Sequence, residues 1–258
     1  MPVAFVALFL PGSLVVSYPL ARLRRVLTLR ADPWSPEYGM GFQASLEEPP
    51  RRADPFVETS DWSRPVRPRA EGPRTVWFVD GVRRVDVRLI VENGSRRVPG
   101  LFGSYAVGAV RCNARAEFGQ HAVARALVTG GGLVPERVEV PCGADRLAFE
   151  SATDPGDDPD RPLLRLQDLM REREAALAAE VAGGGTELVL VDGPLTLRDP
   201  TRAPVVGVVK RFAGRPTDPR APQNLAPVGG LETWLRHRLG HAGIVRRAVL
   251  EWLSREAA

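Results

Sequence analysis

The segment "TVWFVDGVRRVDVRLIVENG", Thr75 to Gly94, joins the two kinds of strand that define the fold. Its first part, Val76 to Val79, is a continuous apolar run, which is typical of a strand buried on both faces. The part from Arg83 to Asn93 alternates apolar and charged residues, which predicts a half-buried strand. Asn93-Gly94 predicts a tight hairpin turn into a third strand around Leu101 to Arg111. Three antiparallel strands are therefore expected to open the ordered domain.

The end of the first apolar run recurs later in the chain. "FVDG" ends at Gly81 and "LVLVDG" ends at Gly193, so each run stops at an Asp-Gly pair. Asp-Gly is common in turns after strands. Alternatively, functional groups gather at strand ends, and the carboxylates of Asp80 and Asp192, if brought together, would repel each other unless a cation lay between them. Because Mg²⁺ and Mn²⁺ prefer carboxylate oxygens, the two pairs predict either two turns or a divalent-metal site.

A helix is expected from Leu163 to Ala182. Its apolar residues recur on one face, and they are Leu163, Leu166, Met170 and Leu177. Three glycines from Gly183 onward end it. Glu174 falls at the edge of the apolar stripe, Glu172 points into solvent, and Glu180 lies near the stripe in the last turn. Glu174 is therefore a third candidate ligand, and the alternative is that all three belong to a solvated helix face.

The remaining pattern completes an α/β domain. Apolar strands are expected at Leu188 to Val191 and at "VVGVV", Val205 to Val209, which is followed by Lys210. The segment Ala116 to Gly132 fits either a helix or a strand, and Pro135 to Ser151 suggests two short strands. Strand hairpins, a helix and two more strands predict a mixed sheet with flanking helices.

Composition limits the class of protein. The 258 residues are 44% hydrophobic, which is enough for one large core or for one core with a small appendage. The formal net charge of +4 is a mild bias toward polyanions. Cys112 and Cys142 form no CxxC pair, which excludes a disulfide framework or a structural zinc knuckle.

The first 74 residues divide into two segments. Residues 1–30 include an uncharged run from Val3 to Ala21, interrupted by Pro11 and Pro19 and preceded by no basic residue. This extension is interpreted as a membrane anchor, a buried or disordered segment, or the product of a misassigned start codon. Residues 31–74 are rich in Pro, Arg and acidic residues, which predicts an irregular arm. The ordered domain is expected at residues 75–258.

Four motifs resemble the NurA nucleases of DNA end processing. They are "FVDG" at Phe78 to Gly81, "MREREAAL" at Met170 to Leu177, "LVLVDGPL" at Leu188 to Leu195 and "VVGVVKR" at Val205 to Arg211. Their order and spacing are similar to those of the family, and they span about half of the chain. "ADPWSPEYG" and "GLFGSYAVGAV" resemble features of a divergent actinobacterial branch. The resemblance implies an RNase H-like fold and a cytoplasmic protein.

The same resemblance implies an activity and its residues. The activity is Mn²⁺-dependent (or Mg²⁺-dependent) hydrolysis of DNA, as a 5'-to-3' exonuclease and endonuclease in the resection of double-strand breaks. In a two-metal mechanism, Asp80, Asp192 and Glu174 would be the metal ligands, and Lys210 would offset charge on the scissile phosphate. Contacts to the DNA backbone are expected from Arg83, Arg84 and Arg211.

The chain departs from the family after Arg211. NurA proteins usually continue well beyond the lysine motif and carry a late histidine, for which His241 is the candidate here. The alternative for His237 and His241 is a place on the surface of a basic terminal helix. Because the C-terminal part is short, the alternative function is a catalytically inactive RNase H-like scaffold that binds DNA or a HerA-type translocase. Expected partners are DNA, a HerA-type ATPase and a second copy in a homodimer, with no stable membrane association.

Overall fold

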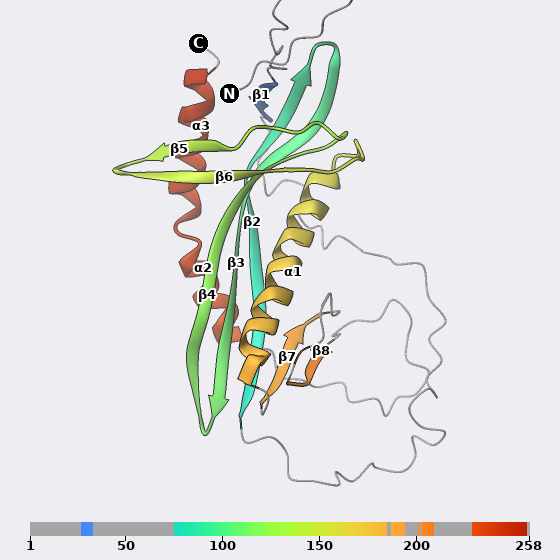
Figure 1. Ribbon diagram of the computed structural model, residues 1–258. Helices are drawn as coiled ribbons and strands as arrows, with labels where there is room; N and C mark the ends of the chain where they lie inside the picture. Colours follow the sequence, from blue (N-terminus) through green and yellow to red (C-terminus); the bar gives the residue numbers. More distant parts are fainter. Residues whose placement is uncertain are drawn as a thin grey trace, which may run out of the picture.

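The computed structural model describes residues 27–32, 75–184, 187–193, 201, 203–208 and 229–256. An eight-stranded mixed sheet forms the centre of the domain, and helices cover both of its faces (Figure 1). The strands are β1 Thr28–Ala31, β2 Val76–Asn93, β3 Arg96–Asn113, β4 Arg115–Thr129, β5 Val138–Cys142, β6 Asp145–Thr153, β7 Leu188–Asp192 and β8 Val205–Val208. The helices are α1 Arg161–Val181, α2 Gly229–Arg238 and α3 Ala242–Glu256, with a 3-10 turn at Ala182–Gly184. The expected α/β class with a mixed sheet is confirmed.

The strand order is β5-β6-β4-β3-β2-β7-β8, and β1 also pairs with β2. Strands β2, β3 and β4 form an antiparallel meander, whereas β7 and β8 run parallel to β2. Parallel strands need a long crossover, and α1 lies in the connection that leads to β7. The first half of β2 therefore lies in the interior of the sheet, between β3 and β7, which explains its continuous apolar run.

Strand β2 differs from the sequence expectation. It continues without a turn through Asp80 and Gly81, and it pairs with β3 over nearly its whole length, apart from a bulge between Val85 and Val87. The alternative that the first Asp-Gly pair makes a turn is therefore wrong, because pairing with β3 holds this backbone extended. The hairpin turn is confirmed: Asn93 pairs with Arg96, and Gly94 has a φ of 62°.

The ambiguous middle segment is a strand. Ala116 to Thr129 lies in β4, which pairs with β3 on one side and, over Ala126 to Thr129, with β6 on the other. The two short strands expected after it are β5 and β6, which form an antiparallel hairpin. Pairing with β3 decides the conformation of β4, and this information lies outside the segment itself.

Strand β1 crosses the expected boundary between residues 30 and 31. It pairs antiparallel with the far end of β2, from Thr28 opposite Glu92 to Ala31 opposite Leu89. The uncharged run Val3 to Ala21 and most of the Pro- and Arg-rich arm lie outside the described residues. Within the part of the chain that the structure describes, no helix has the length and apolar character needed to cross a membrane.

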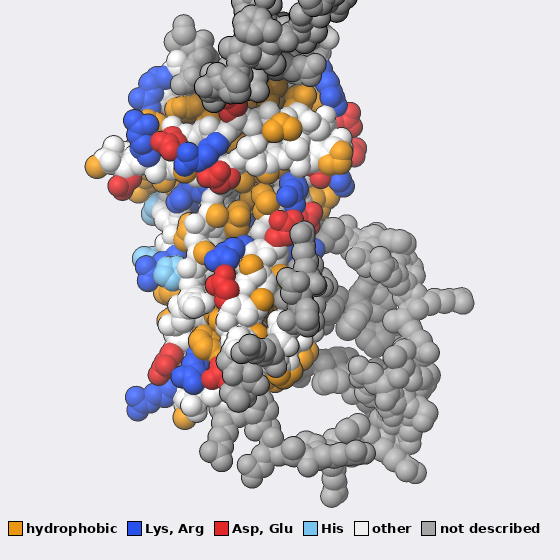
Figure 2. Space-filling view, in the orientation of Figure 1, with side chains coloured by type: hydrophobic (Ala, Val, Ile, Leu, Met, Phe, Trp, Pro, Cys, Tyr) orange, Lys and Arg blue, Asp and Glu red, His pale blue; other side chains and the backbone are white. Residues whose placement is uncertain are grey.

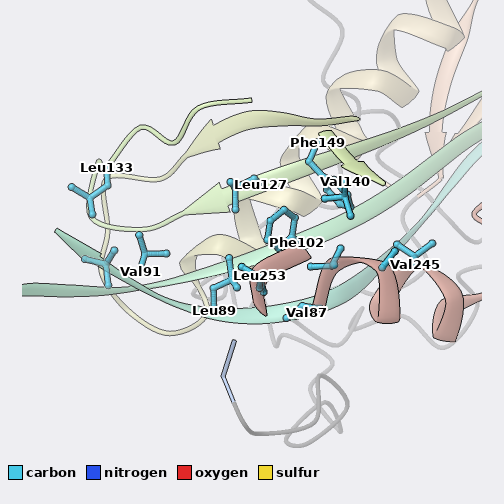
Figure 3. Close-up of a cluster of buried hydrophobic side chains, with 13 residues drawn as sticks. Val87, Leu89, Val91, Phe102, Leu127, Leu133, Val140, Phe149, Val245 and Leu253 are labelled. Carbon is cyan, nitrogen blue, oxygen red and sulfur yellow. The ribbon is translucent and has the colours of Figure 1, made fainter. Parts of the chain in front are cut away.

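The two faces of the sheet carry different helices. On one face, Val79 and Val107 pack against Met170 and Leu177 of α1. On the other face, α2 packs through Leu231, Leu235 and Leu239, and α3 packs through Val245, Val249 and Leu253. Figure 3 shows the cluster that contains the α3 residues, with Phe102 beside Phe149. Their ring centroids lie 4.8 Å apart at 85°, a favourable edge-to-face contact.

Candidate functional site

Two carboxylates meet on adjacent parallel strands. The last paired residues of β2 and β7 are Val79 and Val191, and each is followed directly by an aspartate. Continuing the register by one residue sets Asp80 beside Asp192 at one strand spacing, about 4.8 Å between backbones. Both aspartates are half-buried. The expectation that the fold brings these two carboxylates together agrees with the register of the sheet, but Asp80 lies within β2 and only Asp192 ends its strand.

Glu174 approaches the same place from α1. Glu174 is 4% exposed, and its carboxylate lies against the backbone of Gly81. A Cβ atom at position 81 would come within 2.5 Å of Glu174 Oε1 and 2.9 Å of Met170 Cγ. Gly81 has no positive φ, so its role is to leave space for the glutamate. Gly193, in contrast, has a φ of 90° and does turn the chain after β7.

The three carboxylates interact electrostatically. Burial, followed by the charges of Asp80 and Asp192, raises the pKa of Glu174 from its ordinary 4.5 to about 8, while Arg171 opposes this rise. Desolvation and like charges both disfavour the ionised carboxylate. The Gly81 N–H donates to Asp80 Oδ1 at 2.8 Å and orients that side chain. At neutral pH, Glu174 therefore holds a proton that a nearby cation would displace.

The helical phase of the glutamates is confirmed. Glu172 is exposed and pairs with Arg165, at 2.8 Å from Arg165 Nη1 to Glu172 Oε1. Glu180 is also exposed and pairs with Arg173. Only Glu174 of the three is buried, because α1 turns its apolar stripe and the edge of that stripe toward the sheet.

The carboxylates are the oxygen donors that Mg²⁺ and Mn²⁺ prefer. Among the described residues, however, no three His, Cys, Asp or Glu side chains are grouped as a metal site requires. Strand alternation turns Asp80 toward the α2 face, whereas Glu174 comes from the α1 face. The donor types fit a divalent ion, and the raised pKa of Glu174 fits it too, but gathering the donors around one ion requires side-chain rotation.

The two predicted DNA-binding arginines of β2 point to opposite faces. Arg83 lies on the α1 face, where its Nε donates to Gln167 Oε1. Burial, and then the charge of Arg171, lower the pKa of Arg83. An anion beside these two guanidinium groups would relieve their repulsion, so Arg83 and Arg171 are suited to a phosphate.

Arg84, in contrast, makes hydrogen bonds within the fold. Its Nε donates to Asp86 Oδ1 at 2.8 Å, and its Nη1 donates to the carbonyl oxygen of Gly240 at 2.8 Å, just beyond the end of α2. Asp86 is 2% exposed and also accepts a hydrogen bond from Ser104 Oγ. Arg84 therefore attaches the α2–α3 junction to the sheet.

Three predicted site residues remain. Lys210 and Arg211 lie outside the described residues. His241 is exposed and precedes α3, next to Gly240. Its neighbour Gly240 accepts a hydrogen bond from the guanidinium of Arg84, which lies four residues along β2 from Asp80.

A row of residues that the sequence analysis missed extends from Asp80 across the sheet. Asp80 pairs with Gly108, and Gly108 pairs with His121 of β4. Trp234 of α2 lies over this row, because the missing side chain of Gly108 lets α2 approach. An exposed Phe118 stacks on Trp234. The only sequence signal was aromatic residues in two segments whose contact depends on the tertiary fold.

Comparison with known proteins adds no assignment. No protein-family model matches this chain, and no curated protein matches it. The functional interpretation therefore depends on the carboxylates, arginines and aromatic residues of the chain itself.

Proposed function

We propose that this protein is a divalent-metal-dependent DNA nuclease with an RNase H-like domain, related to the NurA nucleases of DNA end resection. One observation carries the proposal. Two aspartates end their apolar runs side by side on adjacent parallel strands, and their charges add to burial in raising the pKa of Glu174 on α1. Burial and like charges disfavour the ionised form of Glu174, and a bound cation would offset this effect.

The order of the elements supports the RNase H-like interpretation. Three antiparallel strands, β2, β3 and β4, are followed by the β5–β6 hairpin, then by helix α1, and then by two strands parallel to β2. Apart from this hairpin, an RNase H-like domain has this succession, with its acidic residues on the first strand, on the helix after the third strand and at the end of the fourth. We propose Asp80 on β2, Glu174 on α1 and Asp192 on β7 for these three roles.

The residues that would hold Mn²⁺ or Mg²⁺ are Asp80, Asp192 and Glu174. A bound ion supplies a nucleophile at neutral pH and stabilises charge on the phosphate. Glu174 must lose its proton to become a ligand, so ion binding releases a proton and strengthens as the pH rises toward 8. Arg83 and Arg171 supply the cationic groups for the backbone of the bound strand.

The proposal is tested by incubating the full chain with linear DNA and Mn²⁺, Mg²⁺ or EDTA. Cleavage is expected with the metal ions and absent in EDTA. Asp80→Asn, Asp192→Asn and Glu174→Gln are expected to lose at least a hundredfold in rate, about the effect of removing a group that stabilises transition-state charge. Glu172→Gln is the matched control, because Glu172 lies on the same helix and is exposed.

A folded wild-type protein that neither binds the ions nor cleaves DNA would reject the nuclease, and the inactive scaffold then takes its place. Equal loss of activity in Glu172→Gln and Glu174→Gln would instead reject the assignment of Glu174 as a metal ligand. Association with a HerA-type ATPase and with a second copy follows from the same proposal, and co-purification of both proteins from one host tests it.

A further inference from the structure

An exposed aromatic cluster lies where β4 meets α2. Phe118 and Trp234 stack, with ring centroids 4.6 Å apart and planes at 16°. His121 contacts the edge of Trp234 at 4.9 Å, and the guanidinium carbon of Arg238 lies 5.1 Å from the centre of the Trp234 ring. We name Phe118, His121, Trp234 and Arg238 the aromatic platform. Phe118 remains 54% exposed, so the stack is open to solvent.

A bulge in β4 builds this platform. Phe118 and His121 are three residues apart and would face opposite sides of a regular strand. Their partners on β3, Val110 and Gly108, are only two apart, so β4 carries one extra residue between them. Both side chains therefore face α2. Bulges often re-aim side chains beside functional sites.

The platform lies on the same row as the aspartate pair. Asp80, Gly108 and His121 are successive partners across β2, β3 and β4, so roughly 10 Å of backbone separates the first from the last. Gly108 carries no side chain between them, and an added Cβ there would meet Leu235 and Trp234. A ligand on the platform would thus lie within a short chain length of the carboxylates.

The charges around the platform indicate the class of ligand. Arg238 and His121 are exposed members of it, and His237 is exposed on the same helix. Figure 2 shows arginine and histidine side chains together at the left of the molecule, over the region of α2 in Figure 1. A flat ring that carries an anionic group matches both the exposed stack and these cations. An unpaired nucleotide has this combination, whereas the bases of a duplex are already stacked on one another.

We propose that the aromatic platform binds an unpaired base of single-stranded DNA, with Phe118 as the stacking residue, and directs the neighbouring backbone toward Asp80 and Asp192. This inference takes its ligand class from the proposed nuclease function. It adds a substrate class, a strand with an unpaired segment, and a residue that selects it. Base stacking on an aromatic side chain contributes enough free energy to change affinity by about tenfold or more per base.

The test measures binding of the full chain to fluorescein-labelled oligo(dT) by anisotropy in EDTA, where no metal-dependent cleavage occurs. Phe118→Ala is expected to weaken binding about tenfold. Phe118→Leu keeps apolar volume but loses the flat ring, so it is expected to weaken binding similarly. Neither is expected to change binding to an abasic oligomer with the same sugar–phosphate backbone. Ile244→Ala is the control, since Ile244 is an equally exposed apolar residue at 59%.

Wild-type affinity for oligo(dT) in Phe118→Ala would overturn the proposal, as would wild-type affinity in Phe118→Leu or equal losses on both oligomers. A change of oligomeric state in Phe118→Ala without a change in DNA binding would identify the platform as a contact between copies. The nuclease proposal fails separately: a wild-type protein that does not cleave but binds oligo(dT) through Phe118 keeps the platform. The two proposals can be tested separately because the binding assay is run without metal and does not depend on cleavage.

Discussion

Glu174 and Gly81 are in direct contact: the space that a Cβ atom at position 81 would need is occupied by the Glu174 carboxylate, 2.5 Å away at Oε1. This contact joins α1 to the middle of β2 at the residue after Asp80. It gives the glycine of the first Asp-Gly pair a role other than turning the chain. Gly81 therefore makes room for the Glu174 carboxylate and also donates a hydrogen bond to Asp80.

Gly81→Ala is expected to destabilise the protein by about 1–3 kcal/mol, because the added methyl group collides with Glu174 and Met170. A strand glycine without such neighbours would gain stability from alanine. Urea unfolding measures the change. In a Glu174→Ala background, Gly81→Ala should reduce the free energy of unfolding by a smaller amount. The destabilisation caused by Gly193→Ala should be the same in both backgrounds, because it comes from the φ of 90° at Gly193. An unchanged cost of Gly81→Ala in both backgrounds contradicts the contact.

The stability of the metal-free protein should depend on the protonation of Glu174. Because its folded pKa is about 8 and its ordinary value is 4.5, the folded state retains a proton that the unfolded chain releases. Its contribution to stability is complete below the ordinary pKa and is lost as the pH rises through about 8. As the pH rises from about 4 to about 9 in EDTA, the melting temperature of the wild type should fall more than that of Glu174→Gln. Parallel curves for the two proteins would argue against the raised pKa.

Mn²⁺ should stabilise the folded protein if the carboxylates bind it. An ion that binds only the folded state adds about 2.7 kcal/mol at a hundredfold excess over Kd. The melting temperature of the wild type is therefore expected to rise with Mn²⁺, while Asp80→Asn and Asp192→Asn lose most of this rise and keep their fold. Glu172→Gln should respond like the wild type. A Mn²⁺-induced rise of the same size in both aspartate variants would place the ion elsewhere.

Arg83 and Arg84 are adjacent in sequence but should respond differently to substitution. Arg84→Ala leaves Asp86 buried without its ion-pair partner, and a loss of about 3 kcal/mol is expected in chemical unfolding. Arg83→Ala should weaken DNA binding and reduce the salt dependence of log K by about one unit. The double variant Arg84→Ala/Asp86→Ala should lose less stability than the two single losses together. A salt-dependent DNA defect in Arg84→Ala equal to that of Arg83→Ala would reverse these roles.

Local periodicity was enough to predict the main elements and one site residue. Apolar alternation and Asn93-Gly94 predicted the β2–β3 hairpin, because turn chemistry and pleat are properties of neighbouring residues. The apolar stripe of α1 set the phase of the helix, and this phase alone separated buried Glu174 from exposed Glu172. Both predictions depend on contacts within a few residues.

What depends on distant partners was decided only by the tertiary structure. The first Asp-Gly pair is extended because it pairs with β3, and the second turns because β7 ends there. Adjacent Arg83 and Arg84 belong to different faces, and the bulge in β4 turns Phe118 and His121 toward one helix. The sequence by itself determined most of the strands, the long helix and the phase of that helix. Strand pairing decided which side chains share a face, because a one-residue change of register moves every side chain of a strand to the other side.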